Sequence, residues 1–491
     1  MKLEELSAVE LGRRIAAREL SSREVTLYFL DRANRLDGEL NAFIHIDSEE
    51  GLRLAESADN AISHGDVASP LAGVPVAIKD VLCTSSMPTT CGSKMLEHYQ
   101  PPYTATAVKN LTRAGLVPIG KTNMDEFAMG GSTETSHFGL TRNPWAKDRT
   151  PGGSSGGAAA SLAAGMVPLS IGSDTGGSVR QPAAFCGVCG IKPTYGRISR
   201  HGLVAFASSL DQVGPLAHYV EDVAAILQLL SGHDNRDSTS LKQPVPRFTA
   251  ELNKSLKGIR VGVIHEHLEH EALDSEVRAA VLDGQRVLED LGATLVDVTL
   301  PHTKYSVPTY YLVAPSEASG NLSRYDGVHF GFRSRVSAAL ESPLDAMIAR
   351  SRSLGFGAEV RRRVMLGTFA LSAGYYDAYY KKALQVRRLI ANDYRAAFER
   401  VDVLLGPVTP RPAFQLGENT DDPVRMYLED LFTVGANLAG IPAMSIPAGF
   451  TAGGLPLALH LEGPAFGESR LLNVAYQLQQ AKFFNAKLAP V

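Results

Sequence analysis

Two runs rich in glycine and serine contain the side chains best suited to chemistry. The first is 151–157, Pro-Gly-Gly-Ser-Ser-Gly-Gly, and the second is 172–178, Gly-Ser-Asp-Thr-Gly-Gly-Ser. Glycine at this density lets the backbone approach a ligand closely and adopt positive φ. Such loops present backbone N–H groups that hold negative charge. A serine hydroxyl beside them is a candidate nucleophile whose oxyanion hole is formed by the loop itself.

Other interpretations of these runs compete. Gly/Ser-rich segments often act as flexible linkers, but the intervening stretch 158–171 contains apolar residues typical of buried structure. A phosphate-binding loop is a second alternative, yet no Gly-Lys-Ser/Thr ending follows Gly157. No Gly-x-Ser-x-Gly elbow surrounds the serines either. The pattern therefore favours a nucleophile loop outside the α/β-hydrolase arrangement.

A serine nucleophile needs a base, and the sequence offers Lys79. The apolar run Val74–Ile78 predicts a buried strand that ends at this lysine. Burial removes hydration from the ammonium and lowers its pKa, which makes a lysine a possible base. The competing interpretation, a surface lysine at a strand end, is the commoner one when Lys79 is considered alone.

Three motifs taken together resemble the amidase signature family. They are Lys79, the run 152–157, and 174–183, Asp-Thr-Gly-Gly-Ser-Val-Arg-Gln-Pro-Ala. Members of that family hydrolyse amides with a Ser–Ser–Lys triad. The resemblance implies that Ser178 is the nucleophile, that Ser154 bridges the other two, and that Lys79 is the neutral base. It also implies a cis, non-proline peptide bond at Ser154.

The resemblance also assigns the oxyanion hole to the backbone of the second run. The candidate donors are the N–H groups of Thr175, Gly176 and Gly177, together with that of Ser178 itself. Ser155 and Ser173 lie within the same motifs. We expect their hydroxyls to hold the turns through side-chain to backbone hydrogen bonds.

Two further segments are similar to one branch of this family, the A subunits of aspartyl/glutamyl-tRNA amidotransferases. They are 120–130, Gly-Lys-Thr-Asn-Met-Asp-Glu-Phe-Ala-Met-Gly, and 365–380, which is rich in tyrosine. The likeness extends from the first helix to about residue 480. It implies a glutaminase subunit that hydrolyses glutamine to glutamate and supplies ammonia to a partner.

Free glutamine carries an α-carboxylate and an α-ammonium, so its site needs an arginine and an acid. By resemblance, the arginine is Arg363, with Arg362 as the second candidate, and the acid is Asp430. The same likeness places Met129 and Gly130 at the substrate and makes Tyr310 a gate for ammonia. A solvated helix face remains the alternative explanation of the arginine cluster 361–363.

The resemblance further implies a heterotrimer with B and C subunits. The partner would use ATP and Mg²⁺ to activate and amidate Glu-tRNA(Gln) or Asp-tRNA(Asn), so we expect no cofactor in this chain. With a net charge of −4 and a pI of about 6.4, the chain does not have the excess of positive charge that is typical of nucleic-acid-binding proteins. Contact with tRNA is therefore expected mainly through the B subunit. The alternative functions are a stand-alone amidase acting on small amides, a scaffold subunit without catalysis, and a nucleotide-dependent enzyme.

Composition limits the remaining possibilities. The first 20 residues are charged throughout, and no run of about 18 apolar residues occurs. We therefore expect a cytoplasmic protein with no membrane segment. Cys186 and Cys189 have the spacing of a redox or zinc motif, but Cys83 and Cys91 are eight residues apart and do not complete a zinc site. Reduced, buried thiols and no metal are expected.

The expected fold is α/β, the amidase-signature fold, with a large mixed central sheet covered by helices on both faces. We expect a single domain over 1–491, made of an N-terminal helical region 1–65, a catalytic core 66–231 and the remaining sheet and substrate-recognition helices 232–491. The local patterns predict two helices within 1–40, a helix after Thr122 or Asn123, a functional loop over 130–153, a strand–helix–strand unit over 259–298, and long helices over 359–380 and 380–401.

Overall fold

A single mixed sheet of 11 strands runs through the computed structural model, which describes residues 2–336, 342–483 and 487–491. The strand order is β1-β3-β2-β4-β6-β5-β10-β11-β9-β7-β8. The strands are β1 (Phe43–Ile46), β2 (Pro75–Lys79), β3 (Val117–Thr122), β4 (Leu169–Asp174), β5 (Cys189–Lys192), β6 (Gln212–Ala217), β7 (Arg260–Ile264), β8 (Thr294–Val298), β9 (Val403–Pro407), β10 (Ala443–Phe450) and β11 (Pro456–Glu462). Strands from all three predicted regions therefore belong to one sheet.

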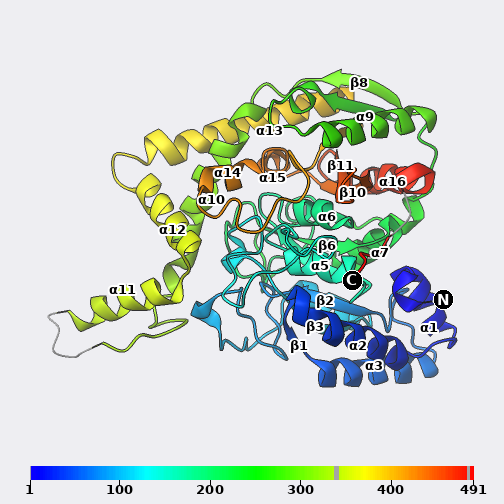
Figure 1. The fold of residues 1–491 in the computed structure, drawn as a ribbon, viewed down its shortest axis with the longest axis horizontal. Coiled ribbons are helices and arrows are strands. Elements are labelled where there is room, and N and C mark those ends of the chain that lie inside the picture. The colour runs from blue at the N-terminus through cyan, green and yellow to red at the C-terminus, as the bar shows by residue number, and fades with distance from the viewer. Residues whose placement is uncertain (1, 337–341, 484–486) are drawn as a thin grey trace.

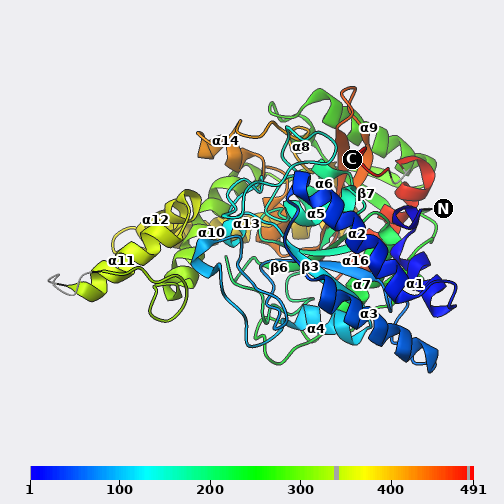
Figure 2. The ribbon, with the colours of Figure 1, turned by 60° about the horizontal axis from the view of Figure 1, so that its bottom comes forward.

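The sheet is covered by helices on both faces (Figures 1 and 2). The helices of the described ranges are α1 (Ala8–Ala16), α2 (Ser22–Leu40), α3 (Ser48–Ser63), α4 (Thr106–Arg113), α5 (Gly156–Ala163), α6 (Arg180–Cys186), α7 (Val220–Leu230), α8 (His265–Leu268), α9 (Ser275–Asp290), α10 (Ser306–Asn321), α11 (Pro343–Gly355), α12 (Ala358–Leu371), α13 (Lys382–Arg400), α14 (Pro423–Leu428), α15 (Val434–Ala439) and α16 (Glu468–Leu478). Of these, α11 and α12 project away from the sheet (Figure 1). The predicted α/β architecture is confirmed.

Strand β2 shows how the two faces are filled. Val76 and Ile78 belong to one hydrophobic cluster, whereas Ala77 between them belongs to another that contains the alanines of α5. Side chains alternate between the faces of a strand, so Lys79 lies on the face of Ala77 and α5. That face is where the first glycine-rich run begins its helix.

The carboxyl ends of three strands bring the sequence motifs together. Strand β2 pairs in parallel with β3 and with β4, and Lys79 lies opposite Thr122 in the first pair. The residues at the ends of β2, β3 and β4 therefore meet at one edge of the sheet. Open α/β sheets bind ligands at such an edge.

Several local predictions are confirmed. Ser21 and Glu24 form a complete capping box at the start of α2, and the Ser7 side chain accepts the Glu10 N–H at α1. The segment β7, α9 and β8 is the expected strand–helix–strand unit, with its strands parallel. The stretch 130–153 contains no helix or strand. Trp145 anchors it, because its indole N–H donates to the Cys186 carbonyl at 2.8 Å.

The helix expected after Thr122 is wrong. Only a short 3₁₀ turn, Glu126–Ala128, follows β3, and Phe127 and Ala128 have positive φ. The cause is the buried Asp125 carboxylate. It accepts the backbone N–H groups of Ser132 and Thr133 at 3.2 and 2.9 Å, which folds the chain back on itself instead of continuing a helix.

The helix expected over 359–380 is shorter than predicted. Helix α12 ends at Leu371, where Ser372 is extended and Gly374 has a φ of +85°. A π-helical turn, η7 (Asp377–Lys381), then leads into α13. Glycine adopts this positive φ without steric cost, so Gly374 marks the break.

No helix within the described ranges is long and apolar enough to span a bilayer.

Candidate active site

Lys79 lies at the centre of a cluster of serine oxygens. Its Nζ is 2.7 Å from Ser154 Oγ and 2.9 Å from both Ser155 Oγ and Ser173 Oγ. The Ser173 carbonyl is a fourth neighbour at 3.3 Å. The lysine side chain is fully buried, so the interpretation of Lys79 as a surface residue is wrong.

Burial lowers the pKa of Lys79 to about 7, although the carboxylates of Asp125 and Asp174 act in the opposite direction. A neutral amine has two N–H groups and one lone pair. Lys79 can therefore donate to Ser155 and Ser173 while it accepts the Ser154 proton. The surrounding oxygens are arranged for a base that is neutral near physiological pH.

Ser154 and Ser178 lie on the two glycine-rich turns. The Gly153–Ser154 peptide bond is cis, as the family resemblance implies. Ser154 is fully buried, whereas Ser178 is 9% exposed. Ser178 is therefore the serine that a substrate can reach. The turns are joined by the Ser155 N–H, which donates to the Ser178 carbonyl at 3.1 Å. Within the described residues, no hydrogen bond joins the Ser154 and Ser178 hydroxyls directly.

Ser155 and Ser173 also hold the turns, as expected. The Ser155 hydroxyl donates to the Ser173 carbonyl at 3.2 Å and accepts the Ser173 N–H at 3.3 Å. Their direct contacts with Lys79 were not predicted from sequence. No local spacing signals these contacts, because they depend on the pairing of β2 with β4 and on where the chain places the turn before α5.

The candidate oxyanion donors have different partners. The Gly177 N–H donates to Asp174 Oδ1 at 2.9 Å, which commits this donor to the turn itself. Among the described residues, no acceptor is found for the N–H groups of Thr175, Gly176 and Ser178. These three remain available to an incoming oxyanion. Position 176 also requires glycine, since a Cβ there would lie 2.6 Å from the Tyr310 ring.

A buried ion pair between Asp174 and Arg180 stabilises the second turn, 172–178. Arg180 donates to both carboxylate oxygens of Asp174, with N–O distances of 3.0 Å, and neither side chain is exposed. Asn437 donates to the same carboxylate at 2.8 Å. Burial opposes ionisation of Asp174, but the Arg180 guanidinium holds the pKa of this carboxyl well below its usual range. The ion pair positions the loop that carries Gly177 and Ser178.

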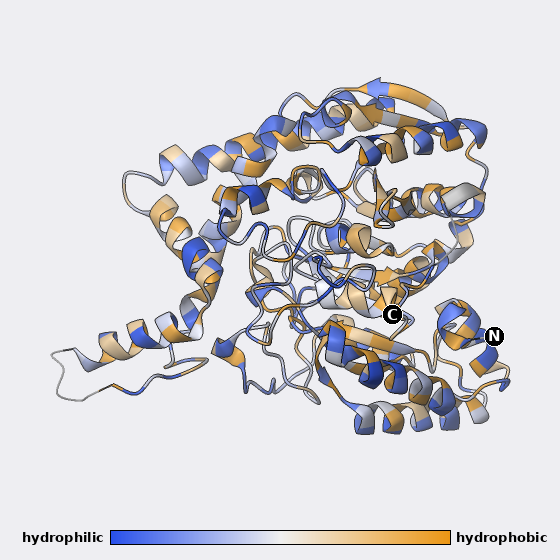
Figure 3. Ribbon diagram, in the orientation of Figure 1, coloured by the Kyte–Doolittle hydropathy of each residue, from blue (hydrophilic) through white to orange (hydrophobic). Residues whose placement is uncertain are grey.

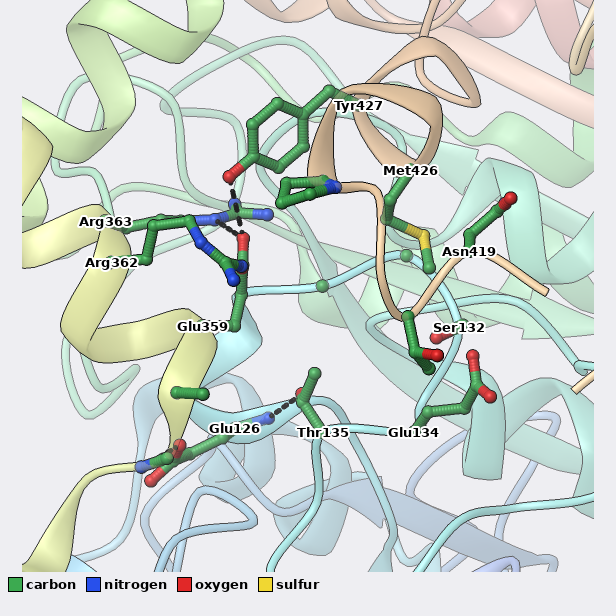
Figure 4. Close-up of a pocket in the computed structure, with 16 residues that line it drawn as sticks. Glu126, Ser132, Glu134, Thr135, Glu359, Arg362, Arg363, Asn419, Met426 and Tyr427 are labelled. Carbon is green, nitrogen blue, oxygen red and sulfur yellow. Dashed lines mark hydrogen bonds and ion pairs between the residues drawn. The ribbon is translucent and has the colours of Figure 1, made fainter. Parts of the chain in front are cut away.

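A cavity of about 220 Å³ lies between the 126–135 loop, the start of α12 and residues 419–427 (Figure 4). Arg362 and Arg363 both line it. Arg363 is buried, and its Nε donates to Glu359 Oε1 at 2.8 Å. Arg362 pairs with the other oxygen of Glu359 and is about half exposed. The cluster is therefore more than a solvated helix face.

Aromatic rings hold the Arg363 guanidinium in place. Its carbon lies 5.2 Å from the ring centres of both Tyr311 and Tyr427. Those two rings stack on each other at 3.8 Å. The Tyr427 hydroxyl donates to Glu359 at 3.0 Å, so the same carboxylate holds both this ring and the Arg363 guanidinium. Cation–π contacts and the ion pair together leave the guanidinium few alternative positions.

Asp430 is linked to this cluster through Tyr311, whose hydroxyl donates to Asp430 Oδ2 at 2.7 Å. Burial raises the pKa of Asp430 to about 7, while the Tyr311 hydrogen bond and the Arg363 charge lower it. The predicted arginine and acid are thus brought into one neighbourhood. Tyr311 and Tyr427 were missed by the sequence analysis, because they come from elements far apart in the chain. Glu359 was also missed, although its i,i+4 spacing from Arg363 on α12 is a local signal that could have identified it.

The remaining candidates have separate positions. Tyr310 is buried against Gly176, and its ring lies 4.9 Å from that of Tyr311. It thus lies between the 172–178 turn and the arginine cluster. Gly130 lines the cavity, whereas the Met129 side chain is fully buried in the main hydrophobic cluster. Any contact of Met129 with a substrate would therefore use its backbone.

Comparison with known proteins shows the family to which the chain belongs. The family described as Amidase matches residues 24–472. This chain belongs to the amidase family. Among its relatives, the A subunit of glutamyl-tRNA(Gln) amidotransferase from Rhodopirellula baltica is 56% identical, with 99% of this chain and 98% of the relative covered. The protein of the same name from Carboxydothermus hydrogenoformans is 53% identical, with 99% of each covered.

A solved amidase-family structure gives the same result. The crystal structure of the A subunit of glutamyl-tRNA(Gln) amidotransferase from Thermotoga maritima superposes with a TM-score of 0.81 at 39% identity. The match covers 99% of this chain and 97% of the Thermotoga chain. The predicted family and fold are confirmed.

Proposed function

We propose that this chain is the glutaminase subunit of a tRNA-dependent amidotransferase that forms Gln-tRNA(Gln) from Glu-tRNA(Gln). One observation carries the proposal: the buried Lys79 Nζ lies 2.7 Å from the Ser154 hydroxyl oxygen. The names of the relatives, which are 53–56% identical over nearly the whole chain, support the amidotransferase role over that of a stand-alone amidase.

In the proposed reaction, Ser178 Oγ attacks the side-chain amide carbon of glutamine. The Ser178 proton passes to Ser154 as Ser154 gives its own proton to neutral Lys79. The negative charge on the amide oxygen is stabilised by the N–H groups of Thr175 and Gly176. Lys79 then returns a proton through Ser154 to the amide nitrogen, and ammonia leaves. The remaining glutamyl ester on Ser178 is hydrolysed by water, with the same groups as base, and releases glutamate.

Substrate recognition in this proposal uses the arginine cluster. Arg363 binds the α-carboxylate of glutamine and Asp430 binds its α-ammonium, while Tyr310 lies where ammonia would leave. Arg363 is favoured over Arg362 because its guanidinium is buried and held by two rings and Glu359.

The partner assignments complete the proposal. B and C subunits form a heterotrimer with this chain in the cytoplasm. ATP and Mg²⁺ belong to the partner subunit that amidates the tRNA, and the tRNA is bound mainly by the B subunit. The acidic net charge of this chain supports that division. Asp-tRNA(Asn) would be amidated by the same complex if the B subunit binds it.

The proposal is tested by measuring ammonia release from glutamine by the purified chain, alone and then with the B and C subunits, Glu-tRNA(Gln) and ATP. We expect strong stimulation by the full set and poor turnover of unrelated amides such as a peptide amide. Turnover of unrelated amides that is indifferent to the partners would instead identify a stand-alone amidase.

The pH dependence of glutamine hydrolysis should report Lys79. Only the neutral amine accepts the Ser154 proton, so kcat should rise as pH increases through the Lys79 pKa of about 7 and level off above it. Asp430 titrates in the same range, but its ionised form would aid substrate binding and so affects KM. The kcat profile of Asp430→Asn at saturating glutamine should therefore keep the same rise. A flat kcat profile between about pH 6 and 9 would exclude Lys79 as the base.

Arg363 and Arg362 can be separated by the same conservative substitution. Arg363→Lys should raise KM for glutamine about 10- to 100-fold, because lysine loses the two-pronged geometry and the ring contacts. The matched variant Arg362→Lys, at the cavity rim, should change KM less than about threefold. We expect kcat to change little in either variant, because carboxylate binding is the same in ground and transition states. A larger effect at Arg362 would reverse the assignment.

A further inference from the structure

The turn between α12 and α13 carries an exposed apolar surface that the proposed chemistry does not use. In Figure 1 this turn stands away from the sheet, and Figure 3 shows apolar colouring along α12. We call the surface the arm patch and define it as Met365, Leu366, Phe369, Leu371, Tyr375, Tyr376, Tyr379 and Leu384. These are eight of the 24 exposed large hydrophobic side chains in the described part of the chain, gathered within 20 residues.

Three aromatic rings form the centre of the arm patch and contact one another. The Phe369 ring lies 4.4 Å from Tyr375 and 6.0 Å from Tyr379, and the two tyrosine rings are 5.8 Å apart. Phe369 is 51% exposed and Met365 is 73% exposed. Monomeric soluble proteins rarely expose clustered apolar surface of this kind without a function.

The composition of the arm patch indicates a protein partner. Aromatic residues and methionine are enriched at the cores of protein interfaces, where a few of them provide most of the binding energy. The rim is basic: residues 361–388 contain five exposed Lys or Arg, at positions 361, 362, 381, 382 and 388, and one acid, Asp377, although the chain as a whole has a net charge of −4. A second copy of this chain would place two basic rims against each other in a symmetric contact, which is unfavourable.

We infer that the arm patch is the docking surface for a partner subunit whose facing surface is apolar with an acidic rim. This inference rests on the proposed function, which requires such a subunit. The position of the arm patch also connects a docked subunit to the active site through packed helices. Helix α12 carries Arg363 on its buried face, and it packs closely on α10, since a Cβ on Gly367 would lie 1.9 Å from the Pro315 carbonyl oxygen. Helix α10 in turn carries Tyr310 and Tyr311.

Two kinds of variant test the docking surface. Phe369→Asp places a charge at the centre of the patch, and the double variant Lys381→Glu/Lys382→Glu reverses its rim. Leu282→Asp on α9, at a similarly exposed position outside the patch, is the matched control. Each full-length chain is mixed with the purified B and C subunits of the same amidotransferase, and the dissociation constant is measured by calorimetry. Both patch variants should bind at least about tenfold more weakly than the wild type, and the control should bind equally well.

The outcomes separate this inference from the proposed function. If the wild-type chain does not bind the B and C subunits, the proposed function fails. If the wild-type chain binds them and the patch variants bind as tightly, the docking surface lies elsewhere and only this inference is overturned. A wild-type dimer that Phe369→Asp converts to monomer would also overturn it, because a second copy would then cover the patch. Circular dichroism and thermal unfolding check that each variant is folded, and the rim variant remains informative if Phe369→Asp is not.

Discussion

Ser178→Ala should reduce glutamine-dependent amidation of Glu-tRNA(Gln) by the assembled complex by about 10⁴-fold or more. Removal of the nucleophile of a catalytic triad has effects of this size, because no other group forms the covalent intermediate. Amidation driven by added ammonium chloride should be unaffected, since this chain is proposed only to supply ammonia. The measurement is the rate of Gln-tRNA(Gln) formation with each nitrogen donor.

The two donors make the Ser178 result specific. A variant that damages the assembly would lose both activities, whereas a variant that damages only glutamine hydrolysis loses one. Ser161→Ala is a matched control, because Ser161 is buried in α5 and its hydroxyl donates to the Ala158 carbonyl of the same helix. It should retain glutamine-dependent activity within about threefold. Full glutamine-dependent activity in Ser178→Ala would rule out this serine as the nucleophile.

Asp174→Asn should destabilise the fold by about 3–5 kcal/mol, the typical cost of breaking a buried ion pair from one side. The substitution leaves the fully buried Arg180 guanidinium without its carboxylate and weakens the acceptor of the Gly177 N–H. With an unfolding entropy of about 2.1 cal/mol/K per residue, Tm should fall by about 3–5 °C. Scanning calorimetry measures the change, and glutamine hydrolysis should fall with it because Ser178 lies on the same turn.

Two comparisons establish the cause of the Asp174 effect. Glu56→Gln removes the carboxylate of an ion pair with Arg23 in which both side chains are more than half exposed, and it should cost less than about 1 kcal/mol. The double variant Asp174→Asn/Arg180→Met removes the unpaired charge, so it should be more stable than Asp174→Asn alone. If Asp174→Asn lowered Tm no more than Glu56→Gln, the ion pair would not be what stabilises the 172–178 turn.

Much of the site could be predicted because its parts are local in sequence. The strand that ends at Lys79 follows from a short apolar run, and the glycine-rich turns follow from composition. The parallel pairing of β2 with β4 then brings Lys79 to Ser173, which a sequence pattern can suggest only once the strand order is known. The family resemblance gave no strand order, but the roles that it assigned to the three motifs required them to lie close together.

The aromatic cluster around Arg363 could not be predicted in this way. Tyr311 and Tyr427 come from α10 and α14, and their stacking depends on how those helices pack with α12. The wrong helix after Thr122 has a related cause, since Asp125 bonds to backbone groups several residues later instead of capping a helix. Tertiary hydrogen bonds outweighed the local preference in that segment.

The most direct test of the central claim is to trap the covalent intermediate. The assembled complex is mixed with glutamine, quenched in acid within the first turnover, and digested for mass spectrometry. We predict one glutamyl group in ester linkage on the peptide that contains Ser178, absent from Ser178→Ala and slow to form in Lys79→Ala. A glutamyl ester on Ser154 or Ser155, or an unmodified Ser178 peptide under conditions in which ammonia is released, would contradict the proposed mechanism.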